Sequence, residues 1–577
     1  MKISVLQGYK GLWPNNNEEI ETLLKDIPSI IVIGLLSAIN SRLYIEGHSF
    51  PLQKNLLYEI FLKRQPKADI DAIINALNLN CKRSTNKDPN VEFAIFTERS
   101  ILKFIESEII NFREMPEEYI DTTPEEELRI FKSILIFNDK TNSEIQYEVK
   151  LKANENDNFY YQALWPMCIK QYNIQLRQNY LYQMIKGIIL MSELKKDKQL
   201  GPYVDLFLKI NNRLSIHDYL FEIVNLIEYC DSGKENGYFS RTGFSLNIEK
   251  TTLRPTFFDT NCIDITNFKK DPRYNIEFTG IKSKPLVKYK ENQYFVLSWV
   301  FLQNKLYEGL IFDFIKTTNL EEEVKINYPN FKSKFSDKIV EKIIFKNVMK
   351  FILEDKYNVL HFDSGQKQPD CYYRKGNWVL LIEFKDVSFA SEAVAIGTYE
   401  SIKEEINKKI CSPKIGVYQL VEQIKLLAQS TIKFDDKIPS REKLTIQPVI
   451  VITDNMFNIP GINKYINDTF KKEIKEINAQ FKLISNLIVL NFDFFFNHMN
   501  DMKDKTFNIQ HAFDDYNNYI KGREKQLKTG RMRSIDFEKS FISFDTYTRK
   551  QLTFKKHHKF IETLFKLFDL KHGLPKG

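Results

Sequence analysis

The sequence predicts an α/β core, ordered helix, three strands, helix, strand, within a larger, mainly helical multidomain chain. Its 577 residues exceed one ordinary domain and correspond to roughly three or four. Residues 1–235 place apolar side chains mainly at helical intervals, whereas from residue 330 one long helical pattern is followed by short apolar runs of strand length. We therefore expect a helical region over 1–235, a mixed α/β connecting region over 236–329, the core over 330–500, and a basic helical region over 501–577.

The N-terminal region contains several predicted helices, among them Lys54–Lys63 and Ala68–Leu77. The apolar run Ser29–Ile39 is too short to cross a bilayer and lacks the basic start and cleavage site of a signal peptide. We expect it to form a buried helix, and we expect no membrane role.

A hairpin is predicted near 130–152. Ile130–Phe137 and Ile145–Lys152 alternate with a period close to two around the turn-like segment Asn138–Asn142. Helical spacing resumes from Tyr160 to Cys230, and the glycine-containing segment Ser232–Gly237 marks a boundary.

The connecting region and the core alternate between strands and helices. Each segment is assigned from its length and its apolar period. The expected strands are Pro285–Lys288, Tyr294–Trp299, Val359–Phe362, Gln368–Tyr373, Trp378–Phe384 and Pro448–Thr453, and the expected helices are Leu302–Lys316, Ser333–Glu354 and Lys414–Ser430.

Three residues of the core carry candidate chemistry. Glu383 and Lys385 lie two apart on a predicted strand, so their side chains leave the same face. Asp370 belongs to the preceding strand, and a tight turn between the strands allows it to pair beside Glu383. Two carboxylates and the carbonyl oxygen of Phe384 are hard oxygen ligands suited to Mg²⁺. An ammonium group on Lys385 would stabilise developing negative charge or hold an attacking water.

The order of elements and these three residues resemble the PD-(D/E)xK nuclease superfamily, whose members share the restriction-endonuclease-like fold. The resemblance covers about Ser333 to Asp454. It implies a Mg²⁺- or Mn²⁺-dependent endonuclease that hydrolyses phosphodiester bonds, with Asp370 and Glu383 as metal ligands and Lys385 as the catalytic lysine. Family members are frequent in bacterial restriction and anti-phage defence, so the resemblance also implies antiviral defence as the biological setting.

The family often adds two further residues. One is an acidic residue on the preceding helix, which Glu341 matches best and Asp337 next. The other is a glutamine on the following helix, which is matched by Gln419, with Gln423 one turn later. A bare E-x-K sequence is common, and this chain has others at Glu148–Lys150, on the predicted hairpin, and at Glu323–Lys325, where no partner strand precedes it. We expect neither to assemble a metal site.

The positive charge of the chain is concentrated after the core. The whole chain has a formal charge of +8. Twelve basic and four acidic residues lie between positions 521 and 559, so this segment alone accounts for the same surplus. We expect its basic side chains to contact nucleic-acid phosphates and its aromatic side chains to pack inward. The candidate binding residues are Lys521, Arg523, Lys525, Lys528, Arg531, Arg533, Lys555 and Lys556.

Other features bear on class and partners. The six cysteines are scattered without metal-binding spacing, which is typical of a reduced, cytoplasmic protein. The chain contains neither G-x-x-x-x-G-K-[ST] nor G-x-G-x-x-G, so it lacks these phosphate-binding motifs. We expect DNA as the first substrate and RNA as the second, with a homo-oligomer or a defence-system protein as partner. The alternative is a non-catalytic nucleic-acid-binding or assembly subunit that uses the nuclease-like core as a platform.

Overall fold

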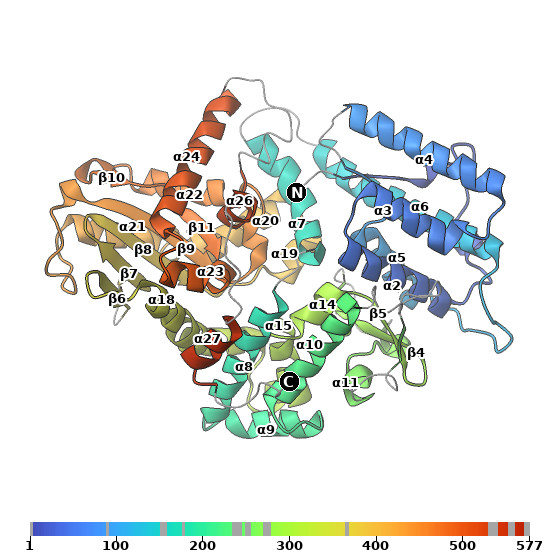
Figure 1. Ribbon diagram of the computed structural model, residues 1–577, viewed down its shortest axis with the longest axis horizontal. Coiled ribbons are helices and arrows are strands. Elements are labelled where there is room, and N and C mark those ends of the chain that lie inside the picture. Colours follow the sequence, from blue (N-terminus) through green and yellow to red (C-terminus); the bar gives the residue numbers. More distant parts are fainter. Residues whose placement is uncertain are drawn as a thin grey trace. The chain divides into compact units, whose positions relative to one another are not determined.

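The computed structural model describes residues 4–87, 92–150, 158–175, 179–232, 245–247, 255–268, 278–363, 368–528, 541–551 and 560–570. Most of these residues are helical, with small sheets, as expected for a mainly helical multidomain chain (Figure 1). The chain forms two compact units. Unit 1 comprises residues 1–153, 174–184 and 203–317, and unit 2 comprises residues 154–173, 185–202 and 318–577. The units interleave along the chain, so their boundaries differ from the four consecutive regions expected from the sequence.

Unit 1 is built from helices, a parallel strand pair and a three-stranded antiparallel sheet of order β3-β5-β4. Its elements are β1 Ser4–Leu6, η1 Tyr9–Gly11, α1 Ile20–Leu23, α2 Ser29–Glu46, α3 Phe50–Leu57, η2 Tyr58–Leu62, α4 Lys67–Lys87, β2 Glu92–Ala94, α5 Glu98–Ile110, α6 Pro124–Lys150, α9 Gly201–Ile210, α10 Ile216–Ser232, β3 Ser245–Asn247, α11 Pro255–Thr260, α12 Ile265–Phe268, α13 Thr279–Ser283, β4 Leu286–Lys290, β5 Gln293–Val296, α14 Trp299–Asn304 and α15 Glu308–Thr317.

Helix α2 forms much of the core of unit 1. It begins at Ser29 as predicted but continues to Glu46, and it is long and apolar enough to cross a membrane by length and composition. In the structure 78% of this helix is buried, and the prediction of a buried helix is confirmed. The buried amide of Asn40 donates a 2.6 Å hydrogen bond to the carbonyl of Leu297, which fixes α2 to the segment after β5.

The predicted hairpin near 130–152 is wrong, because residues 124–150 form the single helix α6. Phe131, Ile134 and Leu135 are fully buried, which is the spacing of a helix with one apolar face. Asn138, expected in the turn, is also buried. Its amide donates to the carbonyls of Gln7, at 2.7 Å, and Ile95, at 2.9 Å. These two carbonyls therefore supply the hydrogen bonds that solvent would supply to an asparagine in an exposed turn.

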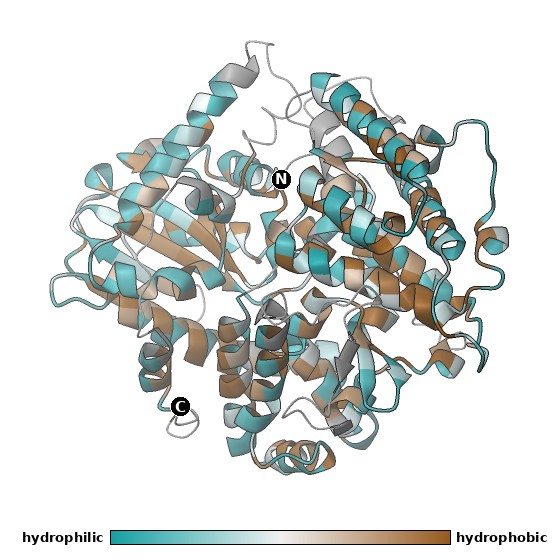
Figure 2. Ribbon diagram, turned by 45° about the vertical axis from the view of Figure 1, so that its right-hand side comes forward, coloured by the Kyte–Doolittle hydropathy of each residue, from teal (hydrophilic) through white to brown (hydrophobic). Residues whose placement is uncertain are grey.

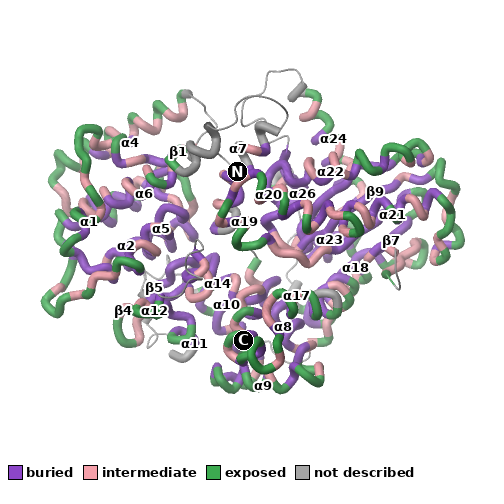
Figure 3. Tube along the Cα trace, turned by 180° about the vertical axis from the view of Figure 1, so that it is seen from behind, coloured by how far each residue is buried: buried purple, intermediate pink, exposed green. Residues whose placement is uncertain are grey.

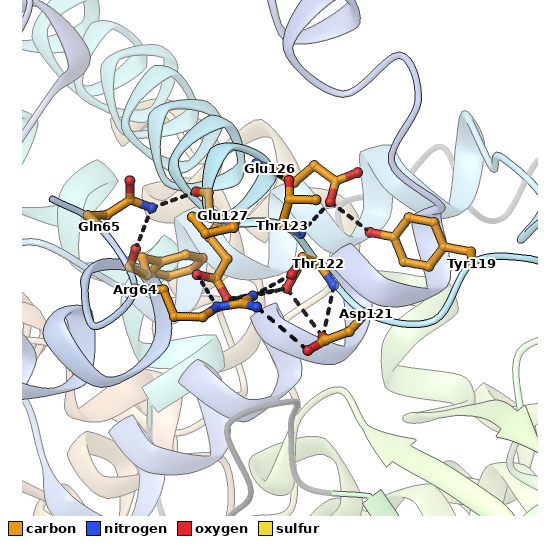
Figure 4. Close-up of polar contacts among 10 residues, drawn as sticks. Arg64, Gln65, Tyr119, Asp121, Thr122, Thr123, Glu126 and Glu127 are labelled. Atoms are coloured by element: carbon orange, nitrogen blue, oxygen red, sulfur yellow. Dashed lines mark hydrogen bonds and ion pairs between the residues drawn. The ribbon is translucent and has the colours of Figure 1, made fainter.

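The start of α6 is fixed by a polar cluster (Figure 4). Thr123 and Glu126 form a capping box, in which the Thr123 N–H donates to Glu126 at 2.6 Å and the Glu126 N–H donates to the Thr123 hydroxyl at 3.2 Å. The guanidinium of Arg64 donates two hydrogen bonds to the buried carboxylate of Glu127 and another to the carbonyl of Thr122. These contacts hold the loop between α5 and α6 against the end of η2.

Unit 2 contains a six-stranded mixed sheet with helices packed against it (Figure 1). Its elements are α7 Asn158–Gln175, α8 Tyr180–Lys196, α16 Leu320–Glu323, α17 Tyr328–Phe335, η5 Ser336–Phe345, α18 Lys346–Leu353, β6 Val359–Phe362, β7 Cys371–Lys375, β8 Trp378–Lys385, α19 Ser391–Ile396, α20 Tyr399–Ile406, η6 Asn407–Cys411, α21 Val417–Ala428, η7 Arg441–Lys443, β9 Thr445–Ile452, η8 Asn455–Asn458, α22 Ile462–Glu473, η9 Asn478–Gln480, β10 Leu483–Ile484, β11 Ile488–Asn491, α23 Asp493–Lys503, α24 Ile509–Lys528, α26 Phe544–Gln551 and α27 Phe560–Leu567.

The strand order of this sheet is β10-β9-β8-β7-β6, and β11 also pairs with β9. Strands β6, β7 and β8 are antiparallel neighbours, whereas β8, β9 and β11 run parallel. The strands are strongly hydrophobic and β8 and β9 are almost entirely buried (Figures 2 and 3). The predicted strands and helices occur in the predicted order, as α18, β6, β7, β8, α21 and β9, but α19, α20 and η6 intervene between β8 and α21. The predicted single helix Ser333–Glu354 is divided among α17, the π-helical segment η5 and α18.

Two segments from the predicted N-terminal region contribute to the core of unit 2. Trp165 on α7 is fully buried, and its indole N–H donates a 3.2 Å hydrogen bond to the carbonyl of Pro460. Its ring also packs against Tyr399 and Tyr465. The core domain therefore includes residues more than 150 positions before the segment that the sequence pattern identified.

We expect Arg64→Ala to lower the free energy of unfolding by about 2–3 kcal/mol, because Glu127, whose side chain is 2% exposed, loses its counterion. The matched control is Lys288→Ala. Lys288 pairs with Asp259 at 3.4 Å, but both side chains are about half exposed, so the loss should stay below about 1 kcal/mol. Urea denaturation of the full chain followed by circular dichroism measures both. Equal losses for the two variants would contradict this account of the α6 N-terminus.

Candidate active site

The strand register brings the three predicted residues together. Cys371 on β7 pairs with Ile382 on β8 in antiparallel register, so the next position outward on each strand is Asp370 and Glu383. Glu383 and Lys385 extend from the same face of β8 because they are two residues apart. The tight turn after Lys375 sets this register. Asp370, Glu383 and Lys385 therefore meet at the carboxyl end of β8, as the sequence predicted.

Direct contacts connect the three side chains. Lys385 Nζ lies 2.8 Å from Glu383 Oε2 and 3.7 Å from Asp370 Oδ2. Asp370 Oδ2 also accepts a 2.6 Å hydrogen bond from the backbone N–H of Phe384. The N–H and carbonyl of one strand residue point to the same side, so the Phe384 carbonyl also faces Asp370.

Burial dominates the electrostatics of this cluster. The Glu383 side chain is 0% exposed, and burial followed by the negative charge of Asp370 raises its pKa to about 7. Burial also raises the pKa of Asp370, although Lys385 and the N–H of Phe384 oppose this shift. Burial would lower the pKa of Lys385, but the charges of Glu383 and Asp370 raise it overall. Lys385 is thus held as a cation, while the two carboxylates lack enough positive charge to compensate their burial.

The glutamine at this site is Gln423, one turn beyond the predicted Gln419. Gln423 on α21 is buried, and its amide N–H donates to Glu383 Oε1. Gln419 instead accepts a 2.9 Å hydrogen bond from the N–H of Gly416 and caps the start of α21. The predicted contact of Gln419 with the site is therefore not made. The carbonyl oxygen of Gln423 is buried without a hydrogen-bond partner, which leaves an acceptor beside the carboxylates.

Glu341 lies on the π-helical segment η5, whose backbone bonds span five residues, as in the bond from the Lys346 N–H to the Glu341 carbonyl. The negative charge of Glu341 contributes to the raised pKa of Lys385. The structure thus places Glu341 within electrostatic reach of the lysine. The side chain of the alternative candidate, Asp337, lies outside the described residues.

Sequence reasoning missed two acidic neighbours of this site. Phe362 on β6 pairs with Cys371, so Asp363 occupies the next position outward, beside Asp370, and its charge helps to raise the pKa of Asp370. Asp386 follows Lys385 directly. It accepts hydrogen bonds from Lys332 Nζ at 3.1 Å and from the Thr453 hydroxyl at 2.7 Å. Asp363 directly follows the predicted strand Val359–Phe362, and Asp386 lies two positions beyond the predicted strand Trp378–Phe384, so a place just past a strand end was the available signal.

The donor set consists of oxygen atoms, which suit Mg²⁺ or Mn²⁺. Within the ranges that the structure describes, no group of three or more His, Cys, Asp or Glu side chains is arranged to hold a metal. Mg²⁺ needs fewer protein ligands, since it is commonly bound by one or two carboxylates and keeps several waters. Asp370, Glu383 and the Phe384 carbonyl supply such oxygens, and a divalent cation would compensate the excess negative charge. The predicted ligands therefore fit the ion chemically.

The described candidate binding residues of the basic segment lie on α24. Lys521 and Lys525 are exposed, and the guanidinium of Arg523 lies 5.3 Å from the centre of the Tyr519 ring. The side chain of Lys528 and the residues Arg531, Arg533, Lys555 and Lys556 lie outside what the structure describes. The aromatic residues Phe541, Phe544 and Tyr547 are buried, which confirms inward packing for these three.

Comparisons of the chain with protein-family models, with curated proteins and with solved structures found no match.

Proposed function

We propose that unit 2 carries a metal-dependent nuclease of the PD-(D/E)xK kind, with a restriction-endonuclease-like core, that hydrolyses phosphodiester bonds in DNA. The observation that carries this proposal is the meeting of Asp370, Glu383 and Lys385 at the carboxyl end of a buried strand. The order of helix, three strands, helix and strand supports it. Burying two carboxylates is costly even beside a lysine, so stability alone gives little reason for this arrangement.

Asp370, Glu383 and the Phe384 carbonyl would hold Mg²⁺ or Mn²⁺. When bound, the ion would act as a Lewis acid that stabilises negative charge on the reacting phosphate and lowers the pKa of an attacking water. The Phe384 N–H fixes one oxygen of Asp370, and Gln423 fixes one oxygen of Glu383. Both ligands would thereby keep their orientation when a substrate enters, as expected of preorganised ligands.

Lys385 would act as a positive charge and hydrogen-bond donor rather than as a general base. Its pKa is raised by Glu383 and Asp370, so the ammonium form is favoured at neutral pH. An ammonium group beside the carboxylates can orient the attacking water and stabilise charge that develops on the phosphoryl oxygens. Glu341 would add to the positioning of this ammonium through its charge.

The substrate and setting follow from the charge of α24 and from the family resemblance. Lys521 and Lys525 are exposed on α24 and supply positive charge that can bind phosphates. Because the core resembles restriction enzymes, we propose DNA rather than RNA as the substrate. We propose bacterial restriction or anti-phage defence as the biological role, on the same resemblance. This part of the proposal rests on analogy of fold.

Purified full-length protein incubated with linear and circular DNA should cleave in Mg²⁺ and not in EDTA. Asp370→Ala and Lys385→Ala should each lower the cleavage rate at least about 100-fold, because they remove a ligand and a charge of the reacting centre. Lys325→Ala, in the E-x-K sequence Glu323–Lys325, is the matched control and should leave the rate within about twofold. Cleavage unchanged in both site variants would contradict the site. Absence of cleavage of DNA and RNA would favour the non-catalytic platform.

The two glutamines of α21 provide a sharper test of the geometry. Gln423→Ala should lower the cleavage rate about 10–100-fold, as is typical when a residue that orients a ligand is lost. Gln419→Ala removes only the contact at the helix start, so its rate should stay within about threefold. The reverse order would show that the family's glutamine is Gln419 and that the observed contact of Gln423 is not functional.

The basic face of α24 can be tested through the salt dependence of DNA binding. Lys521→Glu with Lys525→Glu should lower the magnitude of the slope of log K against log [salt] by about 2, since each lost phosphate contact removes about 0.9. Fluorescence anisotropy with a labelled duplex in EDTA measures this slope without cleavage. Lys403→Glu with Lys408→Glu on the segment α20–η6 gives a control of equal charge. An unchanged slope in the α24 variant would remove this helix from the interface.

A further inference from the structure

A cavity of about 530 Å³ lies in unit 2 at the amino end of β8. It is bordered by the last residues of α18, by the turn between β7 and β8, and by the connection from α23 to α24. This volume falls within the usual range for pockets that bind small molecules. All of the segments that line it belong to unit 2.

The pocket is separate from the candidate active site. Trp378 lines the cavity and Lys385 belongs to the carboxylate cluster, and these residues are seven positions apart on β8, or about 23 Å at the usual rise per residue. Trp378 also shares the face of β8 that bears Phe384, whereas Glu383 extends from the other face. A ligand in this pocket would therefore not contact the reacting groups.

Aromatic rings provide one part of the lining. Trp378, Tyr373, Tyr357 and Phe507 all contribute to the cavity. Tyr357 is 81% exposed, which is unusual for a large aromatic side chain. Lys356 Nζ lies 4.8 Å from the centre of its ring, and a ligand can displace this exposed lysine. Flat aromatic surfaces of this kind stack on planar heterocycles, and nucleobases are the common example.

Lysine side chains provide the other part. The cavity is lined by Lys375, Lys503 and Lys505 and by the acids Glu354 and Asp355. Lys505 pairs with Asp355 at 3.0 Å, and Glu354 pairs with Lys350 at 3.7 Å. Among the described residues, Lys375 and Lys503 form no ion pair with an acid. Lys503 Nζ instead lies 5.4 Å from the centre of the Phe351 ring. The lining thus carries three lysines against two acids, and this surplus of positive charge favours an anion.

We propose that this pocket binds a nucleotide unit, with the base against the aromatic rings and the phosphate at Lys375 and Lys503. A purely apolar ligand would leave two ammonium groups without a counterion, and an inorganic anion would leave most of the cavity and its aromatic surface unused. The amides of Asn358, Asn508 and Gln510 also line the pocket and can bond to the edge of a base. The same chemistry is offered by a free mononucleotide and by the end of a nucleic-acid strand.

The experiment is isothermal titration of the full chain in EDTA with two probes, adenosine monophosphate and a 5′-phosphorylated tetrathymidylate. Saturable binding of either probe at one site is expected. Lys375→Glu with Lys503→Glu should weaken it at least 10-fold, and Tyr357→Ala about 10-fold through loss of stacking. The control Lys472→Glu with Lys482→Glu changes two exposed lysines outside the lining by the same charge and should leave the affinity within about twofold.

The outcome identifies the source of the nucleotide. Binding of the mononucleotide indicates a free small-molecule ligand, whereas binding of the oligonucleotide alone indicates a strand end. No binding of either probe, or equal affinity in the pocket and control variants, would overturn the proposal. Repeating the titration with Asp370→Ala separates this inference from the proposed nuclease, because pocket binding should persist when the carboxylate site is lost. Circular dichroism of each variant verifies that it is folded.

Discussion

The candidate site of unit 2 depends on burying the carboxylate of Glu383 at the end of a hydrophobic strand. An ionised carboxylate without partners is very costly in such a place. Three neighbours reduce this cost: Lys385 on the same strand, Gln423 on α21, and a cation or proton that Asp370 and Glu383 would share. Lys385 lies on β8 itself, Asp370 directly precedes β7, and Gln423 lies on α21, so the carboxylate links the register of β7 and β8 to the placement of α21. Any shift of these elements would expose the charge or leave it unpaired.

The sequence allowed the core of this site to be predicted because its determinants are local. The turn between β7 and β8 is short, so the pairing that places Asp370 beside Glu383 follows from counting residues along two strands. The continuous apolar run that ends at Glu383 indicated a strand covered on both faces, and β8 is buried as expected. The same local reasoning excluded the E-x-K sequence Glu323–Lys325, since Glu323 lies on the short helix α16 without a strand partner.

The errors have a different physical origin, because each involves contacts distant in sequence. Asn138 looked like a turn residue, yet the carbonyls of Gln7 and Ile95 satisfy its amide inside a helix. Gln419 and Gln423 lie one turn apart on the same face of α21, so the position of this helix relative to β8 decides which of them reaches Glu383. The contribution of α7 to unit 2 through Trp165 left no local signal in the sequence. Pattern reasoning thus identified elements and short-range pairing, whereas helix rotation and unit boundaries required tertiary contacts.

One end of β8 bears the carboxylate cluster and the other end borders the lysine-rich pocket. Helices α18 and α23 extend from one of these ends to the other. Phe384 packs between Phe345, immediately before α18, and Phe492, immediately before α23, directly beneath the carboxylate cluster. The opposite ends of these helices, at Leu353 and Met502, line the lysine-rich pocket. Close-packed side chains resist independent displacement, so a ligand that moved either helix end would also press on Phe384, whose N–H holds Asp370. Continuous packing alone does not establish coupling. A ligand would affect the carboxylates only if it bound two arrangements of α18 and α23 with different affinity.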